Sequence, residues 1–374
     1  MKTMWRGLAA VVLTVVVVAG ACSSSTPTST GTVPPGVVNG ELVRFDEPVT
    51  LRVLAHDSFA VSQSVLDEFE RATNVRVELV QNGDAVTMTN AAILTAGNPV
   101  ADVVFGVDEN LLGAVAAAGL LVPYRAVRLS DVDPSFVVVD DGLVTPIDHG
   151  DVCVNFDRQA LAQSRLPVPQ GFDDLASPTL SGKFVVEDPA SSTPGLAFML
   201  ATIARFGGGD DTTADAAWLR YWKALKANGV KVVDGWETAY YGEFSGGSGK
   251  GTRPLVVSYA SSPPAEVSDT SLAVDATPTG VVAATCYRQT EFAGILRGAR
   301  QPAAAAAFIE FMLGRSFQAD LPGQMYVYPV VPDTPLPDTF AKYTAVVDEP
   351  LSLPYAEVAA NRDRWVTQWS ALFR

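Results

Sequence analysis

The chain has 374 residues, of which 48% are hydrophobic and 18% charged, and its formal net charge is −15. This length exceeds what one hydrophobic core usually fills, so two lobes or domains are expected, and the composition is that of a globular protein rather than a disordered one. The acidic balance argues against nucleic acid or an anionic membrane surface as a partner, since either would need clusters of Lys and Arg, and it fits a cationic ligand.

The N-terminus has the pattern of an export signal. Two basic residues precede an apolar run over residues 8–18, which is too short to cross a bilayer and is typical of a secretory signal. The sequence "AGAC" at its end resembles the lipobox of bacterial lipoproteins, in which the Cys becomes the lipidated first residue. We therefore expect a signal peptide over 1–21, lipidation of Cys22 and a Ser/Thr/Pro-rich tether over 22–47. Ordinary signal cleavage nearby is the alternative.

From Val49 onward, predicted strands and helices alternate. Strands are expected at 49–55, 75–80 and 101–107, and helices at 64–73, 86–97 and 110–119, where Gly97 and Gly119 end their helices. Such alternation is typical of a doubly wound, mostly parallel sheet, which binds ligands beyond the carboxyl ends of its strands. The loops "HDSFA", "NGDA" and "DEN" lie at those ends, and each carries an Asp.

A second unit follows residue 147. Its predicted strands are 148–157, 182–188, 254–260, 284–296 and 325–330, and its predicted helices are 194–206, 215–227, 302–313 and 357–373. The strand 284–296 is expected to return to the first unit. The sequence therefore predicts an α/β protein of two lobes with a ligand cleft between them: lobe 1 from 48–147 and 288–320, and lobe 2 from 148–287 and 321–374. No later segment is long and apolar enough to span a membrane.

An enzyme is the less favoured interpretation. His56 stands beside Asp57 and Ser58, which would suit a secreted hydrolase, but no nucleophile-elbow motif is present and triad members seldom adjoin in sequence. His149 lies four residues before Cys153, which on a strand places the two side chains on one face but far apart. No metal-binding or phosphate-binding motif occurs in the right context, so we expect no catalytic residues, no metal and no cofactor.

The stretch "VVEDPASSTPGLAFML" places hydroxyls and a proline where a predicted strand meets a predicted helix. Ser192 or Thr193 is suited to cap the helix, with Pro194 as its first residue. Three consecutive hydroxyls exceed what a cap requires, and a helix N-terminus offers free N–H groups to an anion or a polar tail. Aromatic residues at loop junctions, above all Trp236 and Tyr259, would suit stacking on a flat cationic ring.

These motifs together resemble the thiamine-binding component of bacterial ABC importers, a solute-binding protein of the type II periplasmic class. The matching stretches include "HDSFA", "FERATNVRVELVQNGDAV", "ADVVFGVDENLL", "EDPASSTPGL", "GWETAYYGEF", "SYASSPP" and "MYVYPV", and they run in the family's order from about residue 48 to the end. The resemblance implies a type II fold and a ligand between the lobes. It implies that Asp84 contacts the ring system, that Ser192 and Thr193 face the hydroxyethyl or phosphate end, and that Trp236 and Tyr259 wall the site. His56, Ala85 and Tyr326 complete the expected set.

The chain departs from the family's pattern at several of these positions. The family often has Tyr at His56 and Trp at Gln63 and Tyr326, and an aromatic residue is replaced by Ala265. Fewer aromatic residues would make a looser pocket or select a related ligand. We expect a monomeric receptor, outside the cytoplasmic membrane or in the periplasm, that binds thiamine or a thiamine phosphate and delivers it to an ABC permease.

Three alternatives remain open at this stage. A protein of the same class could bind another solute, such as a polyamine or ferric iron, although the adjacent Tyr240 and Tyr241 are a weak signal for iron. A hydrolase that uses Ser58 and His56 is the second. A receptor that signals to a membrane sensor is the third.

The two Cys residues of the exported part, Cys153 and Cys286, are predicted to form a disulfide. An even number of Cys residues suits an oxidising compartment once Cys22 is acylated. Two buried free thiols are the alternative, because the sequence does not place their Cα atoms within bonding range.

Overall fold

The computed structural model describes residues 33–247 and 249–374. The predicted signal peptide, the lipidation site at Cys22 and the first part of the tether lie outside the described residues. Within the described ranges, no helix combines the length and the apolar character needed to cross a bilayer.

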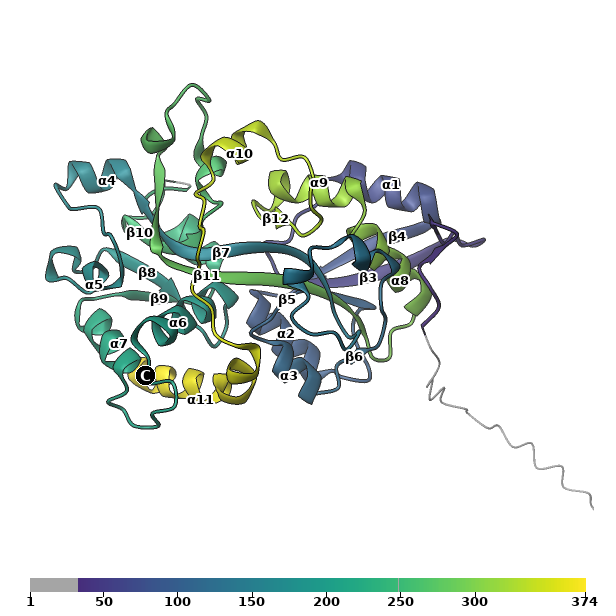
Figure 1. Cartoon of the computed structure of the whole chain (residues 1–374), viewed down its shortest axis with the longest axis horizontal. Coiled ribbons are helices and arrows are strands. Elements are labelled where there is room, and N and C mark those ends of the chain that lie inside the picture. Colours follow the sequence, from purple (N-terminus) through teal and green to yellow (C-terminus); the bar gives the residue numbers. More distant parts are fainter. Residues whose placement is uncertain (1–32, 248) are drawn as a thin grey trace, which may run out of the picture. The chain divides into compact units, whose positions relative to one another are not determined.

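A ten-stranded mixed sheet organises the chain, with strand order β4-β3-β5-β11-β7-β10-β8-β9 and with β6 paired to β11 and β12 paired to β7 (Figure 1). The strands are β3 (Val49–Ala55), β4 (Val75–Gln81), β5 (Val103–Asp108), β6 (Leu121–Val122), β7 (Thr145–Asp157), β8 (Phe184–Glu187), β9 (Lys231–Val233), β10 (Leu255–Tyr259), β11 (Thr279–Leu296) and β12 (Tyr328–Pro329).

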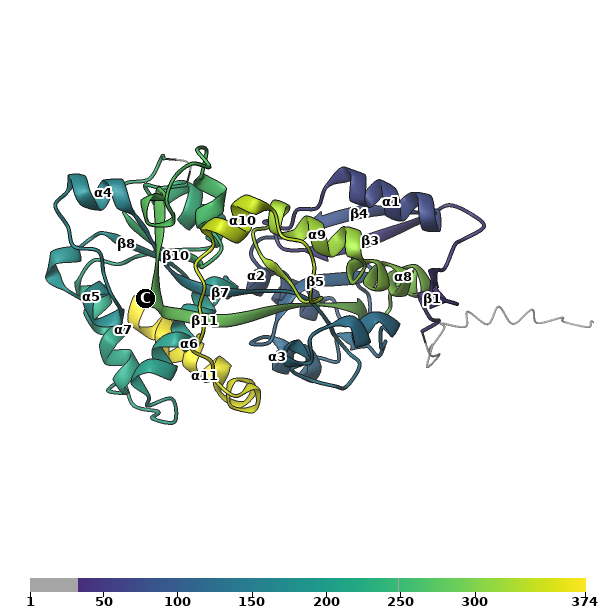
Figure 2. The ribbon, with the colours of Figure 1, turned by 45° about the horizontal axis from the view of Figure 1, so that its top comes forward.

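The sheet has two parallel ends joined by antiparallel strands. At one end β3 pairs in parallel with β4 and β5, and at the other β8 pairs in parallel with β9 and β10. Strands β7 and β11, of 13 and 18 residues, run antiparallel to each other through both ends (Figures 1 and 2). We call the β3–β4–β5 end the first lobe and the β8–β9–β10 end the second lobe. Because β7 and β11 belong to both lobes, one continuous sheet runs through the first and the second lobe.

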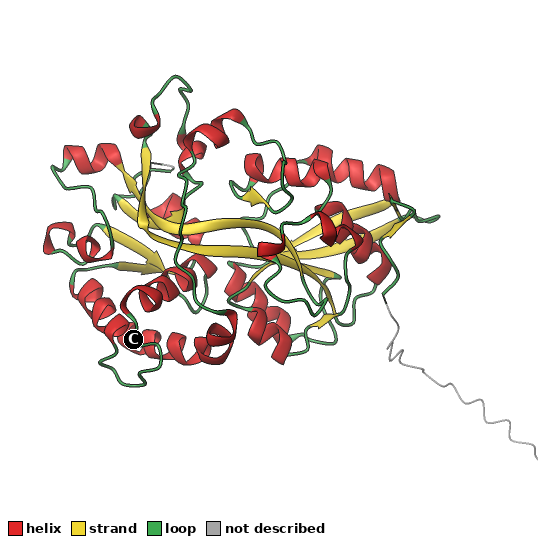
Figure 3. Ribbon diagram, viewed as in Figure 1, coloured by secondary structure: helices red, strands yellow, loops and turns green. Residues whose placement is uncertain are grey.

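Helices cover both faces of this sheet (Figure 3). They are α1 (Gln63–Thr73), α2 (Ala85–Leu94), α3 (Leu112–Ala117), α4 (Arg158–Gln163), α5 (Phe172–Leu175), α6 (Thr193–Phe206), α7 (Ala217–Ala227), α8 (Pro302–Met312), α9 (Arg315–Gln324), α10 (Asp338–Tyr343) and α11 (Tyr355–Phe373).

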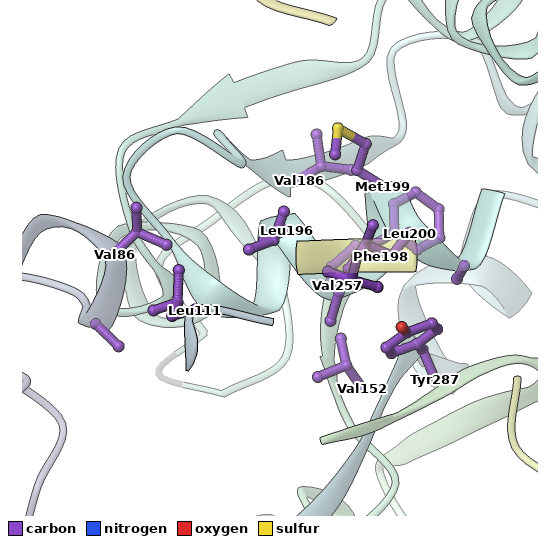
Figure 4. Close-up of a cluster of buried hydrophobic side chains, with 14 of the residues drawn as sticks. Val86, Leu111, Val152, Val186, Leu196, Phe198, Met199, Leu200, Val257 and Tyr287 are labelled. Atoms are coloured by element: carbon purple, nitrogen blue, oxygen red, sulfur yellow. The ribbon is translucent and has the colours of Figure 1, made fainter. Parts of the chain in front are cut away.

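Helix α6 is the best buried of the helices that bear on the site. Every residue from Thr193 to Ile203 is buried. Leu196, Phe198 and Leu200 pack in one cluster with strand residues such as Val257 (Figure 4). Since each fully buried aliphatic or aromatic side chain stabilises the fold by about 1.5–3 kcal/mol, this packing fixes the position of the helix and of its first turn.

The structure departs from the sequence prediction at the end of α2. We expected the helix to continue to Gly97 as its C-cap, but it ends at Leu94. The hydroxyl of Thr95 donates to the carbonyl oxygens of Ala91 and Ala92. These carbonyl groups of the last helical turn therefore have a donor at Thr95, two residues before the expected cap Gly97. Gly97, with φ of +86°, lies in the turn that follows.

Part of the predicted tether is folded. Strands β1 (Val37–Val38) and β2 (Glu41–Leu42) form a hairpin whose turn residues Asn39 and Gly40 both have positive φ. Gly36 lies so close to α8 that a Cβ atom would be 2.4 Å from the backbone of Ala306. The packed chain therefore includes residues 33–47. The Asn-Gly pair was a readable hairpin signal that the Ser/Thr/Pro composition of the preceding residues obscured.

The disulfide between Cys153 and Cys286 is confirmed. It joins β7 to β11, and both Cys residues are buried. It crosslinks positions 133 residues apart in sequence at the two long strands that the lobes share.

Candidate functional site

A cavity of about 310 Å³ lies between the carboxyl ends of the first-lobe strands and the second lobe. Its walls come from the loop after β3, the start of α2, the start of α6, the segment 236–241, the loop after β10, strand β11 and residues 324–327. Both lobes therefore contribute, as expected for a type II solute-binding fold.

The cavity brings together most of the residues that the sequence predicts. His56, Asp84, Ala85, Thr193, Trp236, Tyr259 and Tyr326 line it. Ser192 does not line it: this residue is fully buried behind the wall, where it is the N-cap of α6.

The carboxylate of Asp84 is held by backbone N–H groups from three segments. Its Oδ1 accepts hydrogen bonds from the N–H groups of Ala85 (2.6 Å) and Thr193 (3.1 Å), and its Oδ2 accepts one from Trp236 (3.0 Å). Burial raises the pKa of Asp84, while the N–H groups of Trp236 and Thr193 oppose that rise by stabilising the charged form. This carboxylate thus ties the start of α2 to the start of α6 and to the Trp236 segment.

The close packing of α6 against β8 requires a glycine at position 195, in the "STPG" stretch. A Cβ atom on Gly195 would lie 2.5 Å from the carbonyl oxygen of Glu187, at the end of β8. The first turn of α6 approaches the strand that closely only because Gly195 has no side chain. This approach positions Thr193 for its contact with Asp84.

His56 and Glu291 form the second polar group of the cavity. Nε2 of His56 lies 3.5 Å from Oε1 of Glu291, and both side chains are largely buried. Burial lowers the pKa of His56, but the adjacent Glu291 charge, with Asp84 and Asp57 further away, more than offsets this effect and holds the pKa above its ordinary value. The imidazole ring of His56 packs against Gly106, which has a φ of +90°. A Cβ atom at Gly106 would lie 2.3 Å from this ring, so a larger residue there would displace His56.

A further carboxyl lies behind Glu291. Asp148, fully buried on β7, is directly across the ladder from Glu291, and neither of its carboxyl oxygens has a hydrogen-bond partner among the described residues. Burial, reinforced by the Glu291 charge, raises the pKa of Asp148 well above its usual value.

Aromatic rings form another part of the cavity wall. Trp236 stacks on Tyr240 with ring centroids 4.9 Å apart and an interplanar angle of 17°, and its indole N–H donates to Ser258 at 2.9 Å. Tyr241 meets Trp236 edge to face. Tyr259, at the end of β10, lies against Gly150. The fixed ring orientations offer flat faces to a planar ligand.

The charge of the lining is one-sided. Asp57, Asp84, Glu237 and Glu291 contribute carboxylates, whereas no Lys or Arg is among the lining residues described. His56 is the basic side chain present, and Glu291 balances it. In the described ranges, no three His, Cys, Asp or Glu side chains are grouped so that they could hold a metal ion.

A model of the bacterial extracellular solute-binding proteins matches residues 64–347. The chain belongs to this family. The thiamine-binding periplasmic protein of Escherichia coli K12 is 32% identical over 333 residues, which cover 87% of this chain and 93% of that protein. The protein of the same name from Brucella suis is 32% identical over 337 residues, covering 86% and 91%. A solved structure of a periplasmic thiamin-binding protein, 29% identical, superposes with a TM-score of 0.73 over 92% of this chain and all of that chain.

These similarities confirm the family resemblance and the type II solute-binding fold predicted from the sequence. The relatives named are binding proteins rather than enzymes.

Hydrogen bonds across the cavity join the two lobes of this solute-binding protein. Besides the Asp84 contacts, the hydroxyl of Ser58 donates to Oε1 of Glu237 at 3.0 Å. The N–H and the hydroxyl of Thr87 both donate to the carbonyl oxygen of Ser191, at 3.1 and 3.2 Å. The two lobes are therefore in direct contact at the cavity.

Sequence reasoning missed Glu237 and Glu291. Glu291 was visible as a charged residue in the middle of the apolar strand "ATCYRQTEFAGIL", where an ionisable group is costly unless it is paired or functional. Glu237 follows Trp236 directly, and nothing in the local sequence distinguishes its carboxylate from one on a solvent-exposed helix turn.

Proposed function

We propose that this solute-binding protein binds thiamine, or a thiamine phosphate, in the cavity between its lobes. The support is twofold: relatives at 32% identity over most of the chain carry the name of thiamine-binding proteins, and the cavity has the matching chemistry. Thiamine consists of a cationic thiazolium ring and an aminopyrimidine ring, joined by one carbon and carrying a hydroxyethyl tail.

The observation that carries the proposal is the pairing of aromatic faces with unbalanced carboxylates in one cavity. A cationic ring gains about 0.5–2 kcal/mol from each aromatic face it contacts. The carboxylates of Asp57, Asp84, Glu237 and Glu291 outnumber the basic side chain of the described lining, His56, so the cavity carries surplus negative charge that can neutralise the thiazolium charge. A neutral or anionic solute would leave these carboxylates without compensation.

The proposed roles follow from position in the cavity. Trp236, Tyr259 and Tyr326 supply ring contacts, while Asp84, with Ala85 beside it, orders the wall near the ring system. Thr193 and the buried cap Ser192 shape the wall where the hydroxyethyl tail would end. His56 fixes the orientation of Glu291.

The alternatives fit these contacts less well. The Ser58 hydroxyl donates to Glu237 and His56 pairs with Glu291, so the two are engaged with separate carboxylates rather than as a nucleophile and its base. The Tyr240 hydroxyl donates to Glu266, which argues against paired tyrosinate ligands for ferric iron. A polyamine would also suit an acidic cavity and is the competitor to test. We propose a binding role without catalysis.

We propose that the protein works outside the cytoplasmic membrane as a monomer that delivers its ligand to an ABC permease. Lipidation at Cys22 after removal of residues 1–21 would anchor it, and hinge closure of the lobes would present the loaded state to the permease. The division into lobe 1 (48–147 and 288–320) and lobe 2 (148–287 and 321–374) remains a prediction.

Calorimetric titration with thiamine, spermidine and ferric citrate tests the ligand. We expect binding of thiamine at one site per chain and little heat with the other two. Glu291→Gln should weaken thiamine binding by at least about 30-fold, since loss of a buried charge partner costs roughly 2–5 kcal/mol. Glu78→Gln is the matched control, because Glu78 lies at the surface on β4, where it pairs with Arg52. Tighter binding of spermidine than of thiamine would make the polyamine function the correct one.

A further inference from the structure

Three carboxyl groups lie abreast on neighbouring strands at the wall of the cavity. Glu291 on β11 is in register with Asp108 on β5 and with Asp148 on β7, and all three residues are buried. Side chains of directly opposed residues share one face of the sheet, with Cβ atoms about 4.5–5.5 Å apart, and like charges at this spacing repel. Strand pairing therefore brings two further carboxyls to the side of Glu291, which lines the cavity.

The members of this row differ in their hydrogen-bond donors. Asp108 accepts two hydrogen bonds from the backbone and side-chain N–H groups of Asn110 and one from the side chain of Gln289. Asp148 accepts none from the described residues, although both of its carboxyl oxygens are buried. An ionised carboxylate without a donor is costly in such a place. A protonated carboxyl is itself a donor, so one proton between Asp148 and Glu291 would supply the missing hydrogen bond.

The surroundings of this carboxyl pair favour a retained proton. Burial and the neighbouring Glu291 carboxyl raise the pKa of Asp148 well above its usual value, in agreement with the geometry. His56 is the base beside Glu291, at 3.5 Å. The other titratable or charged groups around the row are Asp57, Asp84, Glu109, Tyr259 and Arg362. Two of these surrounding groups, His56 and Arg362, are bases and the rest are acids, so acidic groups prevail around the pair.

We infer that Asp148 and Glu291 share one proton in the ligand-free protein, and that binding of thiamine beside Glu291 releases this proton to the solvent. The thiazolium ring brings a positive charge to carboxyls that the proton already neutralises in part, so the two cations compete for the same pair. Because binding releases a proton, the affinity for thiamine rises with pH. This inference rests on the proposed function and adds a linked proton to it.

The test is calorimetric titration of the wild-type protein with thiamine at pH 7 in two buffers of different ionisation enthalpy, phosphate and Tris. The aminopyrimidine of thiamine is neutral at this pH, so the protons counted from the buffer dependence of the heat come from the protein. We expect release of about half a proton or more per thiamine, which corresponds to an affinity about threefold or more tighter per pH unit. Binding without proton release, or with proton uptake, would overturn the inference and leave the thiamine function intact. Absence of thiamine binding in both buffers would overturn the proposed function and the linked release with it.

Asp148→Asn tests the assigned pair, because the amide keeps the shape of the side chain but cannot hold the proton. Proton release should fall to about 0.1 per thiamine or less in this variant. Asp57→Asn is the matched control: it removes another carboxyl at the cavity but leaves the pair intact, so release should stay close to the wild-type value. Release that persists in Asp148→Asn and disappears in His56→Gln would assign the proton to the imidazole and overturn the inference. If Asp148→Asn does not fold, release that persists in His56→Gln supports the pair, and its loss there contradicts it.

Infrared spectroscopy tests the shared proton without any ligand. The ligand-free wild-type protein at pH 7 should show a C=O stretching band of a protonated carboxyl that Asp148→Asn lacks and Asp57→Asn retains. Addition of thiamine to the wild-type protein should remove the same band, because the proton leaves on binding. A band that is unchanged in Asp148→Asn would show that the proton lies elsewhere and would contradict the assignment.

Discussion

Gly195→Ala tests how the close approach of α6 to β8 supports the site. The added Cβ atom would lie 2.5 Å from the Glu187 carbonyl oxygen, whereas an ordinary contact is at least 3.4 Å, so the start of α6 must move by about 0.9 Å. Overpacking of this kind costs typically about 1–3 kcal/mol, and the higher helix propensity of Ala returns about 1 kcal/mol of it.

The same shift would lengthen the hydrogen bond from Thr193 to Asp84, now 3.1 Å, beyond bonding distance. A hydrogen bond to a charged group contributes about 1.5–3 kcal/mol, so thiamine affinity should fall by about 10-fold to 100-fold.

Titration calorimetry with thiamine and a thermal unfolding scan measure the two effects of Gly195→Ala. The matched control is Gly323→Ala, which also lies in a helix but has open space at its Cβ position. We expect the control to unfold at or slightly above the wild-type temperature and to bind thiamine within about threefold of wild type. Wild-type affinity in Gly195→Ala would refute the link between the α6 start and closure.

The remaining predictions concern stability and export. Replacing both Cys153 and Cys286 by Ser should lower the free energy of unfolding by about 5 kcal/mol, the chain-entropy value for a loop of 133 residues, as measured by urea unfolding; a loss under 1 kcal/mol would contradict it. Burial, opposed by hydrogen bonds from neighbouring side chains, raises the pKa of Asp108 to about 6. The folded state then holds this proton more tightly than the unfolded state, so its contribution to stability is full below about pH 4 and is lost as the pH rises through about 6. Urea unfolding should give a free energy about 1 kcal/mol lower at pH 7 than at pH 5 from this group, and Asp108→Asn should reduce that difference. Intact mass of the membrane fraction should show a diacyl or triacyl addition on a chain that begins at Cys22; a soluble form beginning elsewhere would exclude the anchor.

The fold was predictable from the sequence to the extent that hydrophobic periodicity marks its elements. Strand β3 occupies the predicted range 49–55 and α7 nearly the predicted 215–227, because their apolar residues repeat with a clear period. Helix α9 was missed, since its sequence contains Pro322 and Gly323, which ordinarily argue against a helix interior. Strand β11 is longer than predicted because pairing with β7 extends it to Thr279, and sequence alone does not contain that partner.

The site was predictable in membership but not in its contacts. Motifs pointed to Asp84, Thr193 and Trp236 separately, and the cavity brings them together. That the carboxylate of Asp84 accepts hydrogen bonds from the N–H groups of the other two could not be read from the sequence, because residues 84, 193 and 236 are far apart in the chain and meet only in the folded structure. The ion pair of His56 with Glu291 was equally hidden, since strand register alone sets it.

Native mass spectrometry of the freshly purified protein, before and after addition of thiamine, tests the central claim most directly. The cavity lined by Trp236, Tyr259 and Glu291 predicts one non-covalently bound thiamine per chain, released under denaturing conditions and absent from a Glu291→Gln sample at the same thiamine concentration. A chain that stays free of ligand in excess thiamine, or one that arrives with a different solute that thiamine does not displace, would contradict the claim that this solute-binding protein is a thiamine receptor.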